Sequence, residues 1–285
     1  MRLLTALTMI SMLLLAACGG SPTPGDQHLE GTAEIMGGKP LADQEAWARA
    51  LVLIEASDGS RCTGALIDHD LVLTASHCVD LLDENDRRVT LKVLVRKARG
   101  GFDTFRTTST RTHEDYALTR TGAYNDIALI KLEHPADFTI PLMKVATTLE
   151  ERSRRSSKFL AVGYGKTKDA FVAEDEERVL RSVSVKITTR MQGRQTTFND
   201  QTDMILVDQR SQRGICSGDS GGPLLRREGS GFEIVGVANL VTNPGNQQEP
   251  CSGYSAYQSV VYQQNWLNRA RFQIREEARG QTNNN

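Results

Sequence analysis

A series of short apolar or alternating runs, separated by polar turns, fills the chain between Ala48 and Trp266 and limits its fold more than any other feature. Many short strands broken by turns are typical of an all-β barrel or sandwich. Only residues 259–278 place apolar side chains at near-helical spacing, which predicts a C-terminal helix. The expected strands are residues 50–54, 63–67, 71–74, 89–95, 127–132, 159–164, 183–187, 204–207, 222–225 and 232–240.

The composition limits the classes of function. The 285 residues allow one large all-β domain or two small ones. Hydrophobic residues make up 39% of the chain and charged residues 24%, which is ordinary for a soluble globular protein. Lys and Arg number 34 against 35 Asp and Glu, so the net charge is −1 and nothing indicates a nucleic-acid partner or a strongly charged substrate.

The N-terminus predicts an export signal rather than a part of the fold. A short positive start precedes a Leu-rich run, which indicates a signal peptide over residues 1–17 and is too short for a membrane span. Residues 15–18 (Leu-Ala-Ala-Cys) resemble the lipobox of bacterial lipoproteins, which implies a lipid anchor on Cys18 in the cell envelope. Gly19 favours the outer membrane. The alternative is an unlipidated secretory peptide that is cut nearby.

The composition also changes at both ends of the expected domain, residues 35–278. Residues 18–34 are rich in Gly, Pro, Ser and Thr, which predicts a flexible tether, and residues 279–285 are expected to be a disordered tail. Of the 5 cysteines, Cys18 is assigned to the lipid, which leaves an even number in an oxidising compartment. Three pairings are open to the remaining cysteines, Cys62, Cys78, Cys216 and Cys251.

Residues 216–223 (Cys-Ser-Gly-Asp-Ser-Gly-Gly-Pro) contain the strongest candidate for a catalytic group. Ser220 lies between glycines and directly after an acid, so the neighbouring backbone N–H groups can reach a reacting oxygen. Glycine permits backbone angles that other residues avoid and leaves room for a substrate. The alternative interpretation is an ordinary turn, since Gly, Asp and Ser are common turn residues.

Three segments together resemble the chymotrypsin-like (trypsin-fold) serine proteases. The octapeptide resembles their nucleophile loop, residues 73–78 (Leu-Thr-Ala-Ser-His-Cys) their histidine motif, and residues 125–130 (Asn-Asp-Ile-Ala-Leu-Ile) their aspartate motif. The order His77, Asp126, Ser220 is that of chymotrypsin and differs from the orders in subtilisins and α/β-hydrolases. The resemblance implies two six-stranded antiparallel Greek-key barrels followed by a C-terminal helix.

The resemblance assigns a role to each member of this triad. Ser220 attacks the scissile carbonyl, His77 takes and returns its proton, and Asp126 orients His77. The backbone N–H groups of Gly218 and Ser220 form the oxyanion hole. The implied activity is that of a serine endopeptidase, which acts on a protein or peptide substrate and needs no cofactor or metal. The disulfides that the resemblance implies are Cys62–Cys78 and Cys216–Cys251.

Asp219 and Ile35 imply activation by cleavage. Residues 35–38 (Ile-Met-Gly-Gly) resemble the N-terminus of the family's activated enzymes, whose amine pairs with the acid before the nucleophile. An activating protease would cut after Glu34; alternatively, Ile35 begins the first strand and is never cut. The propeptide holds no cysteine besides Cys18, so the cut would also release the enzyme from its lipid anchor into the extracellular medium.

Four residues are expected to shape the primary specificity pocket. In the family, the residue six positions before the nucleophile forms the pocket floor, and here it is Gly214 followed by Ile215. The lack of an acid argues against a preference for Lys or Arg, and Arg213 next to the floor could add positive charge there. Val241 replaces a glycine at one wall and narrows the pocket, and Ser255 falls at the second wall. Small or medium uncharged side chains are therefore expected before the scissile bond.

Two alternatives differ from an active protease. One is a catalytically inactive homologue that serves as a surface adhesin or binding lipoprotein, although all three triad residues are present. The other is an esterase of a different fold, because residues 218–222 fit Gly-x-Ser-x-Gly, but the flanking strands and the triad order argue against it. The chain also departs from the better-known members at Tyr164, Asn239 and Leu240, which stand where Trp, Ser and Trp are usual.

Overall fold

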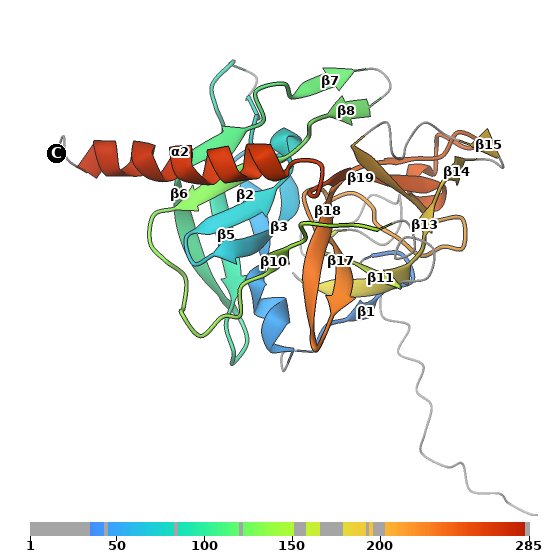
Figure 1. Ribbon diagram of the computed structural model, residues 1–285, viewed down its shortest axis with the longest axis horizontal. Helices are drawn as coiled ribbons and strands as arrows, with labels where there is room; N and C mark the ends of the chain where they lie inside the picture. Colours follow the sequence, from blue (N-terminus) through green and yellow to red (C-terminus); the bar gives the residue numbers. More distant parts are fainter. Residues whose placement is uncertain are drawn as a thin grey trace, which may run out of the picture. The chain divides into compact units, whose positions relative to one another are not determined.

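Strands dominate the computed structural model, which confirms the expected all-β class (Figure 1). The structure describes residues 35–42, 45–82, 85–119, 122–150, 158–165, 179–191, 194–195 and 203–282. The expected signal peptide, the lipidated Cys18, the tether and the cleavage residue Glu34 lie outside the described residues, as do residues 283–285 of the expected tail. In the described part of the chain, no helix is long and apolar enough to cross a membrane.

Six strands of the first half close into an antiparallel barrel, in the order β2-β3-β4-β9-β6-β5. Fully buried aliphatic side chains such as Leu51, Val72 and Ile130 form its core. Gly64 allows two strands to approach closely, because a Cβ there would lie 2.6 Å from Val72 Cγ1. The strands are β2 (Leu51–Ala56), β3 (Arg61–Asp68), β4 (Leu71–Thr74), β5 (Leu91–Arg96), β6 (Phe102–Thr112) and β9 (Ala128–Leu132).

The second half, together with β1 from the N-terminal end of the described residues, forms a nine-stranded sheet that curls on itself, in the order β1-β12-β11-β17-β18-β19-β16-β13, with β10 beside β18. The sheet has to bend because β12 ends at Val185 and β13 begins at Ile187, although they lie near opposite ends of this order. The six central strands match the expected second barrel, and β1, β10 and β13 extend it. The strands are β1 (Lys39–Pro40), β10 (Lys144–Val145), β11 (Phe159–Gly163), β12 (Arg181–Val185), β13 (Ile187–Thr188), β16 (Met204–Asp208), β17 (Pro223–Glu228), β18 (Gly231–Thr242) and β19 (Tyr254–Ser259).

Two hairpins and three short 3-10 helices lie outside the two large sheets in the described part of the chain. Two hairpins join β7 (Ala117–Thr119) to β8 (Gly122–Tyr124) and β14 (Arg190–Met191) to β15 (Arg194–Gln195). The short 3-10 helices are Ala46–Ala50, Ser76–Cys78 and Pro250–Ser252.

The C-terminal helix α2 (Gln264–Thr282) packs on the first barrel, where it contacts β6 and β9 (Figure 1). It begins later than expected, because residues 254–259 belong to strand β19, and it extends past the expected boundary at residue 278. Its buried face carries Trp266, Leu267, Ala270 and Ile274. Two ion pairs join it to the barrel, Arg111–Glu277 and Arg275–Asp68.

Candidate active site

Strand pairing in the first barrel brings the expected histidine and aspartate together. His77 follows β4, Asp126 directly precedes the segment that leads into β9, and the two strands are antiparallel neighbours with Thr74 opposite Ala128. The end of β4 and the beginning of β9 therefore meet at the same edge of the barrel. His77 Nδ1 lies 2.6 Å from Asp126 Oδ2, and the backbone N–H of His77 donates to Oδ1 at 2.9 Å.

Burial of the pair is unequal, which suits a base that must reach a substrate. The side chain of Asp126 is 0% exposed and that of His77 is 27% exposed. A carboxylate only accepts hydrogen bonds, so the proton of a neutral His77 ring resides on Nδ1. The other ring nitrogen, Nε2, then carries a lone pair that can accept a proton, as a general base must.

Three polar residues from distant segments, Gln258, Gln263 and Asp203, hold Asp126 and its neighbour Asn125 in place. The N–H of Asp126 donates to Gln258 Oε1 at 3.2 Å, and Gln258 Nε2 donates to the backbone oxygen of Asp203 at 3.1 Å. Gln263 Nε2 donates to Asn125 Oδ1 at 2.9 Å and to Asp203 Oδ2 at 3.0 Å. Asn125 has a φ of +49°, a conformation that needs such support in a residue with a side chain. The motifs of the sequence do not indicate Gln258, Gln263 or Asp203.

Tyr116 adds to the electrostatics around the aspartate. Burial, reinforced by the negative charges of Asp126 and Asp80, raises the pKa of Tyr116 to about 12. Its hydroxyl therefore stays neutral at physiological pH and adds no negative charge beside Asp126.

The loop that carries Ser220 is bound to the strands that lead to His77. Thr63 on β3 donates its N–H to the backbone carbonyl oxygen of Ser220 at 2.8 Å. Its hydroxyl donates to the backbone carbonyl oxygen of Gly218 at 3.0 Å. Gly221 has a φ of +76°, and a Cβ on it would lie 2.1 Å from Thr74 Oγ1, so conformation and space both require glycine. Ser220 is half-buried. The structure therefore brings the nucleophile loop against the same barrel edge as His77.

Ser220 and His77 are not joined by a hydrogen bond in the described part of the chain. Such bonds are often long in enzymes without substrate and shorten in the substrate complex. The N–H groups of Gly218 and Ser220 likewise donate to no acceptor among the described residues, and both residues are half-buried. Gly218 has a φ of +94°. These two N–H groups are free to bind an oxyanion.

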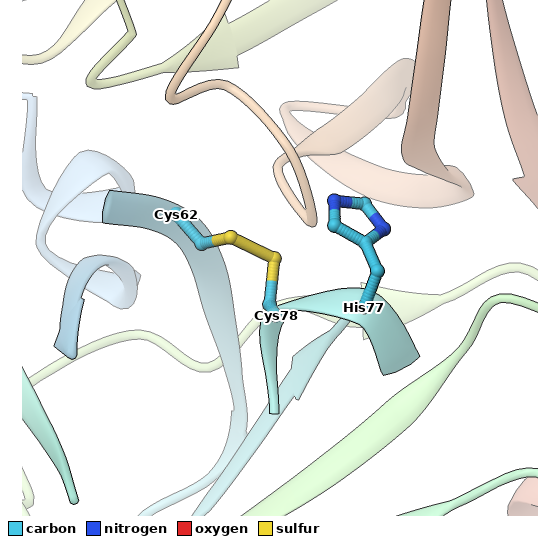
Figure 2. Close-up of side chains that lie close together, drawn as sticks. All are labelled: Cys62, His77 and Cys78. Atoms are coloured by element: carbon cyan, nitrogen blue, oxygen red, sulfur yellow. A yellow bond between two sulfur atoms is a disulfide. The ribbon is translucent and has the colours of Figure 1, made fainter. Parts of the chain in front are cut away.

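A disulfide closes the histidine turn. Figure 2 shows His77 on the same short turn as Cys78, whose sulfur is bonded to Cys62 on β3. One ring nitrogen of His77 and the two sulfurs lie within 4.8 Å of one another, a spacing that would suit a metal ion. Both sulfurs are consumed by the disulfide, so no thiolate is left to bind a metal. The other disulfide is Cys216–Cys251, and both have the pairing that the resemblance implies.

Asp219 and Ile35 are both fully buried. The carboxylate of Asp219 accepts the N–H of Gly165 at 2.8 Å and the N–H of Cys216 at 2.9 Å. Ile35 packs in the main hydrophobic core, and the next residue, Met36, bridges to Gly214, whose N–H donates to the Met36 oxygen at 3.1 Å. The segment that begins at Ile35 thus contacts the expected pocket floor directly.

The expected pocket residues lie on three connected segments. Val241 on β18 is directly opposite Ser255 on β19, and Gly214 and Ile215 are linked through Cys216 to the disulfide. Arg213 next to the floor is exposed, and its Nε donates to the Ser184 oxygen at 3.4 Å.

Arg213 also lines a surface hollow of about 520 Å³, together with Lys186 and Arg210. Its charge is therefore directed toward β12, and it does not form the base of the expected pocket.

The fold and the placement of these residues define a class of proteins, the chymotrypsin-like serine proteases. Residues 35–267 match the family model described as Trypsin, and the chain belongs to the trypsin family.

The chain is similar to curated proteases of animals and bacteria. A trypsin-like protease of Streptomyces glaucescens is 29% identical, over 73% of this chain and 72% of the relative. Neutrophil elastase of Mus musculus is 27% identical, over 78% of this chain and 76% of the relative. A CLIP domain-containing serine protease B4 of Anopheles gambiae is 26% identical, over 79% and 70%.

Proposed function

We propose that the chain is an active serine endopeptidase. The observation that carries the proposal is the contact of His77 Nδ1 with Asp126 at 2.6 Å, at the barrel edge to which the Ser220 loop is bound. A serine hydroxyl is a weak nucleophile near neutral pH and needs a base whose tautomer is fixed, which this contact provides. An inactive binding protein would not need the pair.

The reaction runs through an acyl-enzyme. Ser220 Oγ attacks the scissile carbonyl while His77 Nε2 takes its proton, and the N–H groups of Gly218 and Ser220 bind the developing oxyanion. His77 then gives the proton to the leaving amine. A water molecule then attacks the ester carbonyl while His77 takes its proton, and His77 returns this proton to Ser220 Oγ as the acid product leaves. Asp126 stabilises the charged imidazole at both stages.

Cleavage between Glu34 and Ile35 switches the enzyme on in this proposal. The new amine of Ile35, which is mostly protonated at neutral pH, pairs with the buried carboxylate of Asp219. The hydrogen bond between Met36 and Gly214 supports such coupling, since it joins this segment to the pocket floor. An uncut chain that begins its first strand at Ile35 is the alternative.

The chain is anchored in a bacterial cell envelope through lipid on Cys18, with the outer membrane favoured, and the same cleavage releases it. Analysis of the N-terminus of active, soluble protein tests both ideas. A start at Ile35 without lipid is expected, and active protein that still carries residues 18–34 would contradict them.

The direct test of the activity uses purified protein and a panel of peptide substrates. Ser220→Ala should lower kcat/KM by about 10⁴-fold or more while the protein stays folded. Ser217→Ala, an exposed serine on the same loop, is the matched control and should stay within a few-fold of the parent. If folded parent and Ser220→Ala protein are equally inactive on every substrate, the role of an inactive adhesin or binding lipoprotein is favoured.

A further inference from the structure

Gln209 is a fully buried glutamine directly after β16 whose side chain binds only main-chain groups. Its Oε1 accepts the N–H of Ile215 at 2.6 Å. Its Nε2 donates to the Ile215 oxygen at 3.0 Å and to the Cys251 oxygen at 2.8 Å. Both N–H bonds of the amide are therefore used, and only one lone pair of Oε1 remains.

The amide of Gln209 occupies the space that a side chain at position 214 would need. A Cβ on Gly214 would lie 2.0 Å from Gln209 Oε1 and 2.1 Å from its Cδ. The φ of Gly214 is not in the left-handed region, so the backbone conformation does not require glycine there. Glycine is required at position 214 because the amide of Gln209 fills the space beside it. Gly214 and Gln209 therefore form one steric unit, meaning that a side chain at position 214 and the Gln209 side chain exclude each other.

We infer that Gln209 is the specificity-determining residue at the base of the primary pocket, an inference that rests on the proposed function. The amide is neutral, and its donors are bound to Ile215 and Cys251. A lysine, arginine or acidic side chain that enters the pocket therefore finds no opposite charge on Gln209, and a buried charge without a partner is strongly unfavourable.

The surroundings of Gln209 narrow the substrate class further. Its bonds to Ile215 and Cys251 join the floor to both ends of the segment closed by the Cys216–Cys251 disulfide. Val241, paired with the fully buried Ser255, adds a β-branched wall. A pocket with a filled base and a narrowed wall takes short uncharged side chains, namely alanine, serine, threonine and valine.

Three variants separate a specificity role from a merely structural one. Gln209→Ala empties the base, Gln209→Met keeps its volume and loses its hydrogen bonds, and Gln212→Ala changes an exposed glutamine of the same loop. Each is assayed on peptide substrates that differ only in the residue before the scissile bond: alanine, valine, leucine, phenylalanine or arginine. Thermal unfolding of each variant reports its stability separately.

The parent should favour alanine and valine, and Gln209→Ala should raise the ratio of kcat/KM for leucine or phenylalanine over alanine by about 10-fold or more. Gln209→Met should be less stable and keep the preference for short side chains, and Gln212→Ala should match the parent. A parent that prefers arginine or phenylalanine overturns the inference, as does a Gln209→Ala variant whose kcat/KM falls equally on all substrates.

A combined variant gives an independent readout. Gly214→Asp alone collides with Gln209 and should yield little folded protein, whereas Gly214→Asp with Gln209→Ala has space for the carboxylate. The pair should fold and shift the preference toward arginine and lysine. Equal folding yields of the single and combined variants would count against the steric unit. These outcomes can be distinguished from a failure of the proposed function, because a parent protein that is not a protease hydrolyses none of the substrates.

Discussion

At the scale of single residues, the positions of His77 and Asp126 depend on groups outside the motifs. Asp126 has no freedom to turn, because its carboxylate binds His77 twice and its N–H is held by Gln258. Gln258 in turn binds Asp203, which also accepts a bond from Gln263. We regard Gln258 as a positioning residue, since it acts on the reaction only through Asp126.

Substitution of Gln258 tests this positioning role. Gln258→Met keeps the volume and removes the acceptor of the Asp126 N–H, so kcat should fall by about 10- to 100-fold with little change in KM, because small displacements of a catalytic group are costly. Gln264→Ala, which removes bonds to the oxygens of Ala146 and Val260, should leave kcat close to that of the parent. A Gln258→Met enzyme with unchanged kcat would show that Asp126 needs no such support.

The sequence predicts the motif residues but not their supports, for a physical reason. His77, Asp126 and Ser220 lie in short local patterns, because a tight turn or a strand end demands particular neighbours on either side. Gln209 and Gln258 act through contacts that exist only after distant segments meet, and a single glutamine has no local signature. The expected pocket floor at Gly214 was therefore recognisable, whereas the side chain that fills it was not.

At the scale of elements, the two disulfides fix the two loops that face each other at the site. Cys62–Cys78 ties the histidine turn to β3, with a sequence separation of 16, and Cys216–Cys251 ties the nucleophile loop to the segment before β19, with a separation of 35. A longer closed loop restricts the unfolded chain more, so the second disulfide should contribute more to stability.

Paired serine substitutions measure this difference. Replacing both Cys216 and Cys251 should lower the free energy of unfolding by about 4 kcal/mol, and replacing both Cys62 and Cys78 by about 3 kcal/mol. Denaturant titration under oxidising conditions, with the parent as reference, gives both values. The explanation by loop length fails if the shorter loop proves the more stabilising one, or if neither pair changes the stability.

Strands are predicted correctly where apolar side chains are buried on both faces, and are missed where the strand carries mostly polar residues. The buried run of β4 (Leu71–Thr74) is located from its residues alone. Strand β6 (Phe102–Thr112) is missed because its polar residues are largely half-buried or exposed, so it has no apolar run. Strand β19 (Tyr254–Ser259) is fully buried and yet rich in polar residues, which obscures where strand ends and helix begins. Tertiary pairing, which the local pattern does not contain, decides both cases.

At the scale of the whole molecule, His113 links the first barrel to the C-terminal helix. Its ring stacks on Trp266 with centroids 5.3 Å apart, and its Nδ1 accepts the N–H of Asp115 at 3.0 Å, which only an unprotonated nitrogen can do. Burial lowers the pKa of His113 and outweighs the nearby carboxylates that raise it. The charged groups near it are Glu114, Asp115, Asp203 and Arg269.

This lowered pKa predicts a dependence of stability on pH. Above the pKa of about 6.5 that His113 has in the unfolded chain, His113 is neutral in both the folded and the unfolded state. In that pH range, the protonation of His113 does not reduce the free energy of unfolding. Below that pH the unfolded state takes up the proton first, and the free energy of unfolding falls as the pH drops from 7.5 to 5.5. His113→Gln should reduce this fall, and His134→Gln, at a side chain 76% exposed, should not. Identical pH profiles for the parent and His113→Gln would refute the link.

Labelling with a fluorophosphonate reports whether Ser220 is an activated nucleophile, because the probe reacts only with a serine that a neighbouring base has activated. The label is located by peptide mass spectrometry, on the uncut chain and on a chain that begins at Ile35. We expect modification of Ser220 in the chain that begins at Ile35, little in the uncut chain, and none when His77 is replaced by alanine. Folded protein in which Ser220 stays unmodified in both forms would contradict the role of Ser220 as the nucleophile.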